Sequence, residues 1–313
     1  MDASHRLMHL HPDEMTVARA LQKLAAPGEP VEGGFGSLLG AGLTWIDGQA
    51  RPALALSRGD REGTVSLDFR SMESDGLEPH SKEFDSLLLL RDYVVKSVGP
   101  AGTGVVVFGL PTPRNLVGSG HGARCSGRPS TFGAAVRAAN GKPAFLTAGH
   151  GAPDEGAGAY DADGGELVGF VAATVYPARV RPGVVTPDVA VIEVHDPGRH
   201  GIPQAGWQVA RGREGDLVTS YGSVTSGRSG KIFLYLEESL SEAGPAVGLL
   251  GQVFMVRPAI SAGGDSGAVV VDEGSSHLLG HIVAGWPAVG DYEGYSMFQD
   301  LDYQLGAHGV TLA

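Results

Sequence analysis

Short runs of β-forming residues, separated by turns that contain glycine or proline, recur along the chain from residue 102 onward. Such a pattern is typical of antiparallel strands joined by tight turns, and it leaves little room for helices. The 49 glycines and 19 prolines are spread without a collagen-like period, which also favours turns. About ten strands with few helices predict a barrel or a pair of barrels. The predicted strands are 105–108, 131–137, 144–148, 167–175, 189–194, 217–221, 232–236, 252–256, 268–271 and 278–284.

The first hundred residues carry a mixture of helix and strand signals, and we predict a small α+β module over residues 1–110. A second, mainly β domain is expected over residues 111–313, because the turn-rich pattern begins near this boundary. The elements expected in the module are a helix at 12–26, a hairpin of 43–46 and 50–56 around Asp47-Gly48, a strand at 64–69 and a helix at 81–98.

Charge and cysteine content limit the partners and the compartment. The chain has 23 Lys and Arg against 35 Asp and Glu, a net charge of −12, and neither half carries the clustered basic residues that bind nucleic acid. Its apolar runs are shorter than the ~18–20 residues that span a bilayer, and its first residues lack the pattern of a secretory signal. Cys125 is the only cysteine, which excludes an intramolecular disulfide. We therefore expect a cytoplasmic protein that binds neither nucleic acid nor membranes.

Three segments of the second domain each present one residue type of an acyl-transfer site. His150 ends the strand-like run Phe145–His150. Asp188 directly precedes the alternating run Val189–Val194, and Ser266 follows two glycines and an aspartate. A serine hydroxyl becomes a good nucleophile when an imidazole removes its proton, and a buried carboxylate holds that imidazole in the required tautomer. In the order His, Asp, Ser, these residues predict the triad of a serine hydrolase.

Glycines beside the serine point to a second part of the same site. They let the backbone turn sharply and aim amide N–H groups at one point. The amides of Gly264 and Ser266 are therefore predicted to form an oxyanion hole.

Other residues compete for these roles. Asp161, Asp163 and Asp196 lie in turn-like segments, where a short carboxylate more often bonds to the backbone of the turn. Ser229 lies in a polar, glycine-containing segment that is typical of an exposed loop. The aspartate and serine chosen above are favoured because each adjoins a clear apolar strand.

Taken together, GGDSGA, LTAGH and PDVAVIEV resemble the chymotrypsin-like (trypsin-like) serine proteases, in their bacterial disulfide-free form. The resemblance covers about residues 102–313 and implies two packed six-stranded β-barrels with the site between them. It also implies that His150 is the general base, Asp188 its orienting carboxylate and Ser266 the nucleophile.

The chain departs from the family's pattern at several points. Ala268 stands where a second glycine after GDSG is usual, and the cysteines for disulfides are absent. No IVGG-like start follows an Arg or Lys. Asp265 matches the family's aspartate that shapes the oxyanion loop, and we expect it to bond to a partner inside the chain rather than to a freed N-terminus.

These observations predict a serine endopeptidase that cleaves protein or peptide substrates through an acyl-enzyme on Ser266, with no metal and no organic cofactor. Two alternatives remain open. One is a catalytically weak protease-fold protein that binds or scaffolds a partner, and the other is an esterase that uses the same site. Residues 1–110 are expected to regulate or target the protease, and to offer the surface for a regulatory partner.

The resemblance also implies a specificity pocket. Its floor is expected at Ile260, six residues before the nucleophile, and an aliphatic floor cannot pair the charge of a Lys or Arg side chain. An apolar side chain before the cleaved bond is therefore the first expectation. His281 lies on the strand of the pocket wall, and a one-residue shift in register decides whether it points inward and favours Glu or Gln. The wall itself is expected to consist of Val283, Ala284, Gly285 and Trp286.

Overall fold

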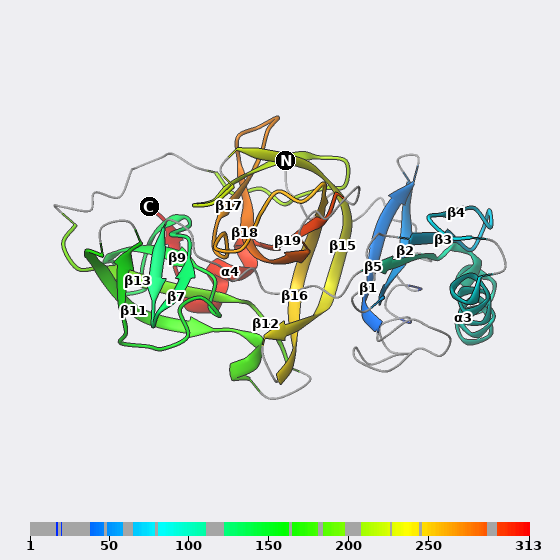
Figure 1. Cartoon of the computed structure of the whole chain (residues 1–313), viewed down its shortest axis with the longest axis horizontal. Helices are drawn as coiled ribbons and strands as arrows, with labels where there is room; N and C mark the ends of the chain where they lie inside the picture. The colour runs from blue at the N-terminus through cyan, green and yellow to red at the C-terminus, as the bar shows by residue number, and fades with distance from the viewer. Residues whose placement is uncertain are drawn as a thin grey trace.

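The structure is a computed structural model of the chain, and its strands form two sheets. It describes residues 38–46, 49–58, 65–78, 81–110, 122–162, 165–180, 184–197, 208–225, 227–243, 246–286 and 293–313, together with Val17 and Ala20. Within these residues, one sheet has twelve strands and the other has eight. Figure 1 shows three regions in a row: a green eight-stranded sheet, a yellow and orange barrel, and a blue and cyan N-terminal module.

Six strands of the larger sheet close into a ring, which we call the second barrel. The ring is closed because β15 pairs with β14 on one edge and with β16 on the other. Apolar side chains fill it, among them Phe254 and Phe298, whose rings stack with centroids 5.0 Å apart. The strands are β14 (Leu217–Tyr221), β15 (Arg228–Ala243), β16 (Ala246–Arg257), β17 (Val269–Asp272), β18 (Leu278–Trp286) and β19 (Tyr295–Asp300).

The eight-stranded sheet is the first barrel. Its strand β13 alternates as the sequence predicts: Ala190 and Ile192 pack into the core of this barrel, while Val189 and Val191 pack into a cluster shared with the second barrel. Helix α4 (Leu301–His308) contributes Leu301 to the same shared cluster. The sheet order is β20 (Thr311–Leu312), β8 (Ala135–Arg137), β9 (Pro143–Thr147), β13 (Val189–Val194), β11 (Leu167–Val175), β10 (Gly158–Asp161), β6 (Ala123–Cys125) and β7 (Arg128–Ser130).

Between β11 and β13, two strands of the first barrel, the chain forms a short helix and a short strand that contacts the second barrel. They are the 3-10 helix η2 (Pro177–Arg179) and β12 (Val185–Thr186). Because β12 pairs in parallel with β16, the segment that leads into β13 touches the second barrel before it enters the first.

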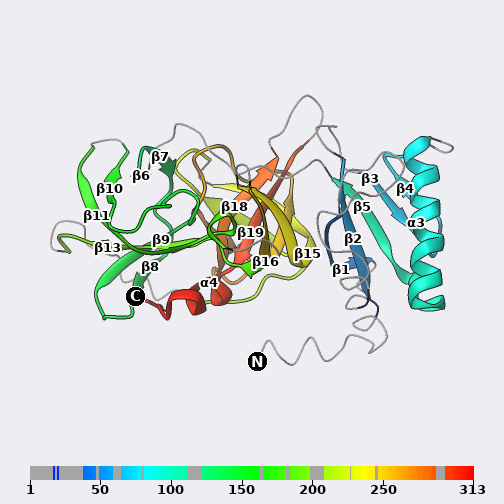
Figure 2. The same ribbon diagram turned by 90° about the horizontal axis from the view of Figure 1, so that it is seen from below.

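The N-terminal module, defined here as the described residues 38–110, is a five-stranded sheet covered by a helix. Helix α3 (Lys82–Val98) begins at Ser81, whose hydroxyl accepts a hydrogen bond from the N–H of Phe84, as an N-cap residue does. The helix lies on one face of the sheet (Figure 2), and its Leu87 and Val94 belong to the same buried cluster as apolar side chains of that sheet. The remaining elements are β1 (Leu38–Ile46), β2 (Gln49–Ser57), β3 (Val65–Asp68), β4 (Ser74–Asp75), the 3-10 helix η1 (Pro100–Gly104) and β5 (Val106–Leu110), in the sheet order β1-β2-β5-β3-β4.

The module joins the second barrel through both its edge and its second face. Strand β1 pairs with β15 at Gly42↔Leu236 and Leu43↔Tyr235, so the module's sheet continues into the barrel. Ala53 and Ala55 on β2 lie in one buried cluster with side chains of β15, β16 and β18. The module therefore shares a hydrophobic core with the barrel that it adjoins.

Several predicted elements are confirmed. The strands at 167–175, 189–194 and 217–221 have the predicted bounds, and the predicted hairpin is formed by β1 and β2, with Ile46 opposite Gln49. The predicted helix at 81–98 is α3. The mainly β fold class is confirmed as well.

Other predictions were wrong or lie outside the described residues. The predicted strand at 131–137 is a strand only from Ala135, because the N–H of Thr131 donates to the Ser266 carbonyl and the N–H of Ala134 donates to His281 Nε2 instead. Strand β19 and helix α4 were not predicted. Of the predicted helix at 12–26, only Val17 and Ala20 are described, and both are helical.

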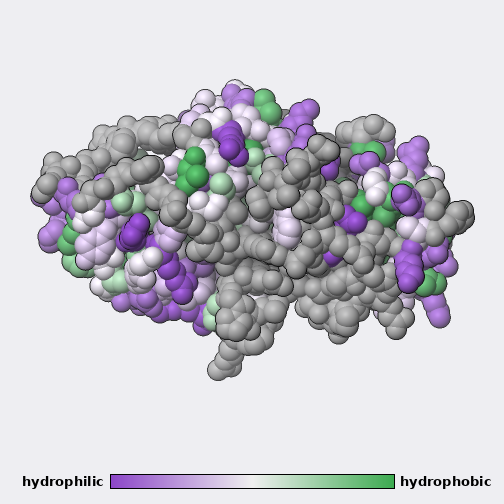
Figure 3. Space-filling model, viewed as in Figure 1, coloured by the Kyte–Doolittle hydropathy of each residue, from purple (hydrophilic) through white to green (hydrophobic). Residues whose placement is uncertain are grey.

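The described surface is mixed in character. Figure 3 shows polar and apolar side chains interspersed on one face of the molecule. Among the residues that the structure describes, no helix combines the length and the apolar character needed to cross a bilayer.

Candidate active site

The structure brings His150, Asp188 and Ser266 together at the interface of the two barrels. His150 Nδ1 lies 2.6 Å from Asp188 Oδ2, and His150 Nε2 lies 2.9 Å from Ser266 Oγ. All three residues are buried. We call them the Ser–His–Asp cluster.

The hydrogen bonds of this cluster fix the tautomer of the imidazole. The Asp188 carboxylate only accepts, so His150 Nδ1 carries the proton and donates to it. Nε2 is then the acceptor that faces the Ser266 hydroxyl. The second carboxylate oxygen, Oδ1, accepts the backbone N–H of His150 at 2.8 Å, which orients both residues together. This arrangement allows the imidazole to take a proton from the serine.

Each member reaches the cluster from the end of a strand. His150 follows β9 after a turn of two small residues, and Asp188 lies between β12 and β13. Both therefore belong to the first barrel. Ser266 lies in the loop before β17 and belongs to the second barrel. The distance between serine and histidine thus depends on how the two barrels are held against each other.

The loop around Ser266 that leads into β17, which we call the serine loop, adopts backbone conformations that suit glycine. Gly264 has φ +101° and Gly267 has φ +92°, which side chains rarely allow. A Cβ on Gly267 would lie 2.5 Å from Thr147 Oγ1, so the loop also needs the space. The carbonyl of Gly264 accepts hydrogen bonds from the hydroxyls of Thr131 at 3.0 Å and Ser223 at 3.3 Å. These bonds hold the loop from the first barrel and from the loop after β14.

Asp265 is held by groups inside the chain. Its fully buried carboxylate accepts the backbone N–H groups of Val224 at 2.8 Å, Thr225 at 3.3 Å and Ala262 at 2.9 Å, and also the Thr225 hydroxyl. Sequence reasoning expected an internal partner but named none. Thr131, Ser223 and Thr225 belong to no motif, so only the folded chain identifies them.

The other serine and aspartates that the sequence offered for these roles do not lie in the Ser–His–Asp cluster, and one of them lies outside the described residues. Ser229 is exposed on β15, where its hydroxyl bonds to Thr219 and Glu273. Asp161 is on β10 and Asp196 follows β13, while Asp163 lies outside the described residues.

The single thiol is no rival to the serine either. Cys125 is buried on β6, and burial raises the pKa of its thiol to about 12. It therefore stays protonated at neutral pH and is a poor nucleophile.

The residues expected to line a specificity pocket fall into two core clusters. Ile260 is fully buried among apolar side chains inside the second barrel. Val283, Ala284 and Trp286 pack in a separate cluster, together with Leu234 and the module residues Ala53 and Ala55. Gly285 pairs with Ser296 on β19. The structure therefore does not join Ile260 and these wall side chains in one cluster.

His281 points between the barrels. Its Nε2 accepts the backbone N–H of Ala134 at 3.0 Å, and its Nδ1 lies 2.9 Å from Gln304 Oε1. Both ring nitrogens are therefore used by protein groups, and neither remains for a substrate carboxylate or amide. Complete burial lowers the pKa of His281 to about 4, so the ring is neutral at physiological pH.

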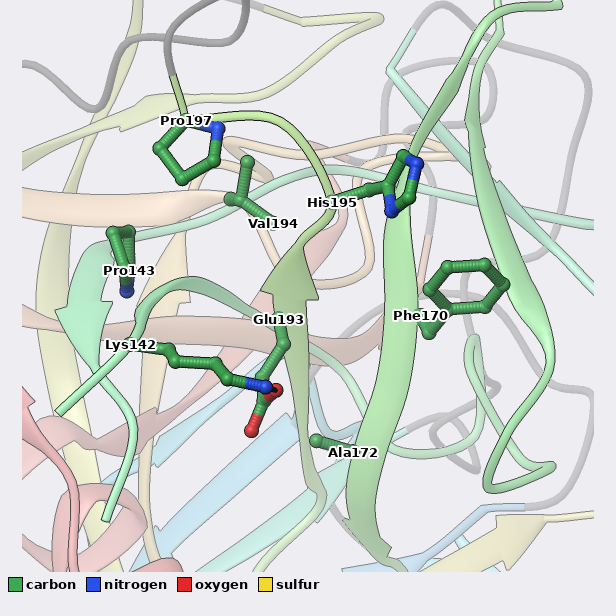
Figure 4. Close-up of a pocket in the computed structure, with 8 residues that line it drawn as sticks. All are labelled: Lys142, Pro143, Phe170, Ala172, Glu193, Val194, His195 and Pro197. Atoms are coloured by element: carbon green, nitrogen blue, oxygen red, sulfur yellow. Dashed lines mark hydrogen bonds and ion pairs between the residues drawn. The ribbon is translucent and has the colours of Figure 1, made fainter. Parts of the chain in front are cut away.

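A surface cavity of about 400 Å³ lies on the outer side of the first barrel, apart from all predicted site residues. In Figure 4, the Lys142 ammonium meets the Glu193 carboxylate, and Phe170 stands beside His195. The rings of Phe170 and His195 meet edge to face, with centroids 5.7 Å apart. Sequence reasoning did not single out this place.

Comparison with known proteins gives matches in structure alone. No family model matches the chain, and no curated protein matches its sequence. Solved structures do match over 63% of the chain. The chain is similar to bacterial chymotrypsin-like serine proteases.

Three of these structures give the extent of the likeness. The Nocardiopsis protease is 20% identical, with 98% of its length covered and a TM-score of 0.46. The Cellulomonas bogoriensis chymotrypsin is 21% identical, with 98% covered and a TM-score of 0.45. A serine protease described as glutamic acid specific is 25% identical, with 99% covered and a TM-score of 0.48.

Proposed function

We propose that this protein is a serine endopeptidase in which Ser266 is the nucleophile, His150 the general base and Asp188 its orienting carboxylate. One observation carries the proposal: a buried serine hydroxyl, 2.9 Å from an imidazole nitrogen whose other nitrogen donates to a buried carboxylate. The structural likeness concerns the fold, whereas the proposal rests on this geometry.

The proposed reaction has two halves. Ser266 Oγ attacks the peptide carbonyl carbon while its proton passes to His150 Nε2, and the carbonyl oxygen becomes an oxyanion facing the amides of Gly264 and Ser266. The C–N bond then breaks as His150 returns the proton to the leaving amine. Water, deprotonated by the same nitrogen, attacks the acyl-enzyme and releases the acid, which restores the serine hydroxyl. Asp188 accepts the hydrogen bond from His150 Nδ1 and stabilises the imidazolium that forms.

Strand β18 supports the binding of an extended peptide. Strand β17 pairs with β18 up to His281, whereas β19 pairs along β18 as far as Trp286. The backbone of Ile282 still bonds to Gly267 and Ala268. Beyond Ile282, no described strand pairs with the edge of β18 that faces away from β19, so this edge suits the backbone of a substrate as an added strand.

We propose an apolar preference at the residue before the cleaved bond. The expected floor residue, Ile260, is aliphatic, so a Lys or Arg side chain bound against it would lack a counter-charge. The alternative preference for Glu or Gln loses its support, because both nitrogens of His281 are already bonded. Cleavage of a peptide library with randomised positions tests this, and dominant cleavage after Lys or Arg would contradict it.

The same acyl-transfer site also allows an esterase, whereas a scaffold protein would have no need of the cluster. Purified wild-type protein and the Ser266→Ala variant are compared on an unfolded protein substrate and on matched peptide and ester substrates. An endopeptidase cleaves the protein internally, and the variant does not. Turnover of esters without turnover of peptides would favour the esterase.

We further propose that residues 1–110 regulate or target this protease, and that it acts on peptides in the cytoplasm. The single cysteine suits a reducing compartment, and the net charge of −12 does not suit nucleic acid. A ligand that binds the module would influence the second barrel through the pairing of β1 with β15. Adding a candidate partner and measuring turnover tests the regulatory part.

A further inference from the structure

A buried chain of polar side chains leads from the second barrel to Asp188, and the proposed reaction does not use it. It consists of Gln299 on β19, Gln304 on α4 and His281 on β18. All three side chains are completely buried. Buried polar groups of this kind are almost always hydrogen-bonded, and their hydrogen-bond partners show which part of the chain they fix in place.

Two of these side chains hold the main chain of Asp188. The N–H of Asp188 donates to Gln299 Oε1 at 2.8 Å, and its carbonyl accepts from Gln304 Nε2 at 3.3 Å. The carboxylate of the same residue is held by His150. Every polar group of Asp188 thus has a named partner; the partner of its N–H, Gln299, comes from the opposite barrel, and the partner of its carbonyl, Gln304, comes from helix α4, which follows β19.

Gln299 has a fixed orientation. Its Oε1 must accept from Asp188, so its amide nitrogen faces the other way and donates to the carbonyls of Gly251 at 2.8 Å and Thr186 at 3.3 Å. Gly251 is on β16, while Thr186 lies two residues before Asp188. One side chain therefore ties the segment that carries the aspartate to the wall of the second barrel.

His281 gives the second glutamine its orientation. The N–H of Ala134 donates to His281 Nε2, so the proton is on Nδ1 and donates to Gln304 Oε1. The amide nitrogen of Gln304 is then left to face the Asp188 carbonyl. The neutral ring thereby links the backbone N–H of Ala134 in the first barrel to Gln304, whose amide nitrogen bonds to the Asp188 carbonyl.

We propose that Gln299, supported by Gln304 and His281, is a positioning residue that holds Asp188, and with it His150, in register with the serine of the opposite barrel. The physical reason is the division of the cluster between barrels: Ser266 moves with the second barrel, whereas His150 and Asp188 move with the first. The side-chain amide of Gln299 from the second barrel, with that of Gln304 from α4, holds the main chain of the aspartate and keeps the Ser266–His150 distance short. This inference rests on the proposed function for its kinetic consequence, but not for its geometric one.

The test replaces Gln299 by Met, which keeps the length of the side chain and removes its hydrogen bonds. The matched control is Ser220→Ala, a buried side chain of the second barrel outside the chain of bonds. A conservative variant, Gln299→Glu, keeps the acceptor for Asp188 N–H and, when protonated in its buried site, one donor. Thermal unfolding of each protein establishes that it is folded.

Two readouts separate positioning from mere support of the fold. The first is turnover of a peptide substrate: kcat of Gln299→Met is expected to fall about 100-fold while KM stays within about twofold, because misplacement of the base slows chemistry without removing binding contacts. The second is the low-field proton NMR signal of His150 Nδ1–H in its short bond to Asp188, which is expected to weaken or disappear. Gln299→Glu is expected to recover part of both, and Ser220→Ala to match the wild type.

Unchanged kcat and an unchanged His150 signal in folded Gln299→Met protein would overturn the inference. If that variant does not fold, Gln304→Met is measured in the same two ways and decides it. The NMR readout needs no turnover. A wild-type protein that cleaves no substrate would therefore defeat the proposed function, while the comparison of signals would still decide whether Gln299 holds Asp188.

Discussion

Buried polar groups are arranged differently in the N-terminal module and in the two barrels. In the module, Arg51 and Asp68 form a two-pronged ion pair, with both N–O distances 2.6 Å, between residues 17 positions apart. In the barrels, the bond between His150 and Ser266 joins residues 116 positions apart. The first kind of contact ties β2 to β3 across the strand β5 that lies between them in one sheet, whereas the second exists only when two barrels dock.

The difference shows where chemistry is placed in this molecule. The Arg51–Asp68 pair has its bonds satisfied within the module, where Arg51 also donates to the carbonyl of Gly104. It can be explained by stability alone. The groups between the barrels depend on docking, so small changes in docking alter their geometry. The comparison leads to variants that should affect activity in one region and stability in the other.

The largest effect is expected at the Ser–His–Asp cluster. His150→Ala should lower kcat by about 10⁵–10⁶-fold, and Asp188→Asn by about 10⁴-fold because the imidazole then adopts the wrong tautomer. Steady-state peptide hydrolysis measures both. Ser229→Ala, at an exposed serine of the second barrel, serves as the control and should keep full turnover. If His150→Ala turned over substrate as fast as the wild type, the barrel interface would not be the place of the chemistry, and the contrast with the module would fail.

A second effect is expected where the first barrel holds the serine loop. The double variant Thr131→Val, Ser223→Ala removes the hydroxyls that bond to the carbonyl of Gly264. Loss of one well-aimed oxyanion donor costs about 10²–10³-fold in kcat. We expect a loss at the lower end of this range, with KM little changed, because the loop is loosened rather than removed. Thr219→Val, on β14 of the second barrel, is the control, and a change in KM alone would contradict the account.

A substitution in the N-terminal module should change the free energy of unfolding and leave turnover unchanged. Burial raises the pKa of the Asp68 carboxyl, but the hydrogen bond and charge of Arg51 outweigh it and hold that pKa below its ordinary value. Arg51→Met should therefore lower the free energy of unfolding by about 2 kcal/mol at neutral pH. The difference from wild type should shrink as the pH falls below the ordinary pKa of the carboxyl, where protonation removes the charge of Asp68. Denaturant unfolding measures this, and kcat of the folded variant should equal that of the wild type.

The smallest effect is expected in how the free energy of unfolding changes with pH, because His281 is buried and neutral. Its pKa is lowered by burial to about 4 in the folded chain, against an ordinary value of 6.5. Between these values the unfolded chain binds one more proton, so stability falls as the pH decreases. From pH 6.5 to 5.5, wild type should lose about 1 kcal/mol more than a His281→Gln variant. Equal losses in both proteins would show that the ring is not held neutral.

The sequence predicted the parts of this site that local motifs carry. His150, Asp188 and Ser266 each stand beside a strand in a recognisable run, and the structure brings them into contact. Gln299 and Gln304 have no such run around them. Their role depends on which backbone groups they meet after the barrels dock, and a single sequence holds no signal for that.

The fold was predictable to a similar degree. Strands with clean alternation, such as β11 and β13, were placed at the correct bounds. The long hairpin of β15 and β16 was predicted only at its apolar centre, because the outer part of β15 contains glutamates and serines. Pairing over the full length of the hairpin overrides that local preference. The direction of His281 was left open, and its bonds to Ala134 and Gln304 show that it points between the barrels.

Covalent labelling tests the central claim most directly, because it requires the whole cluster but no knowledge of the substrate. Folded wild-type protein is treated with a fluorophosphonate, digested, and mapped by mass spectrometry, beside Ser266→Ala and the Ser229→Ala control. The account predicts one adduct on Ser266, which is absent in Ser266→Ala and undiminished in Ser229→Ala. An unlabelled wild-type protein, or equal labelling of Ser266→Ala at another residue, would contradict it.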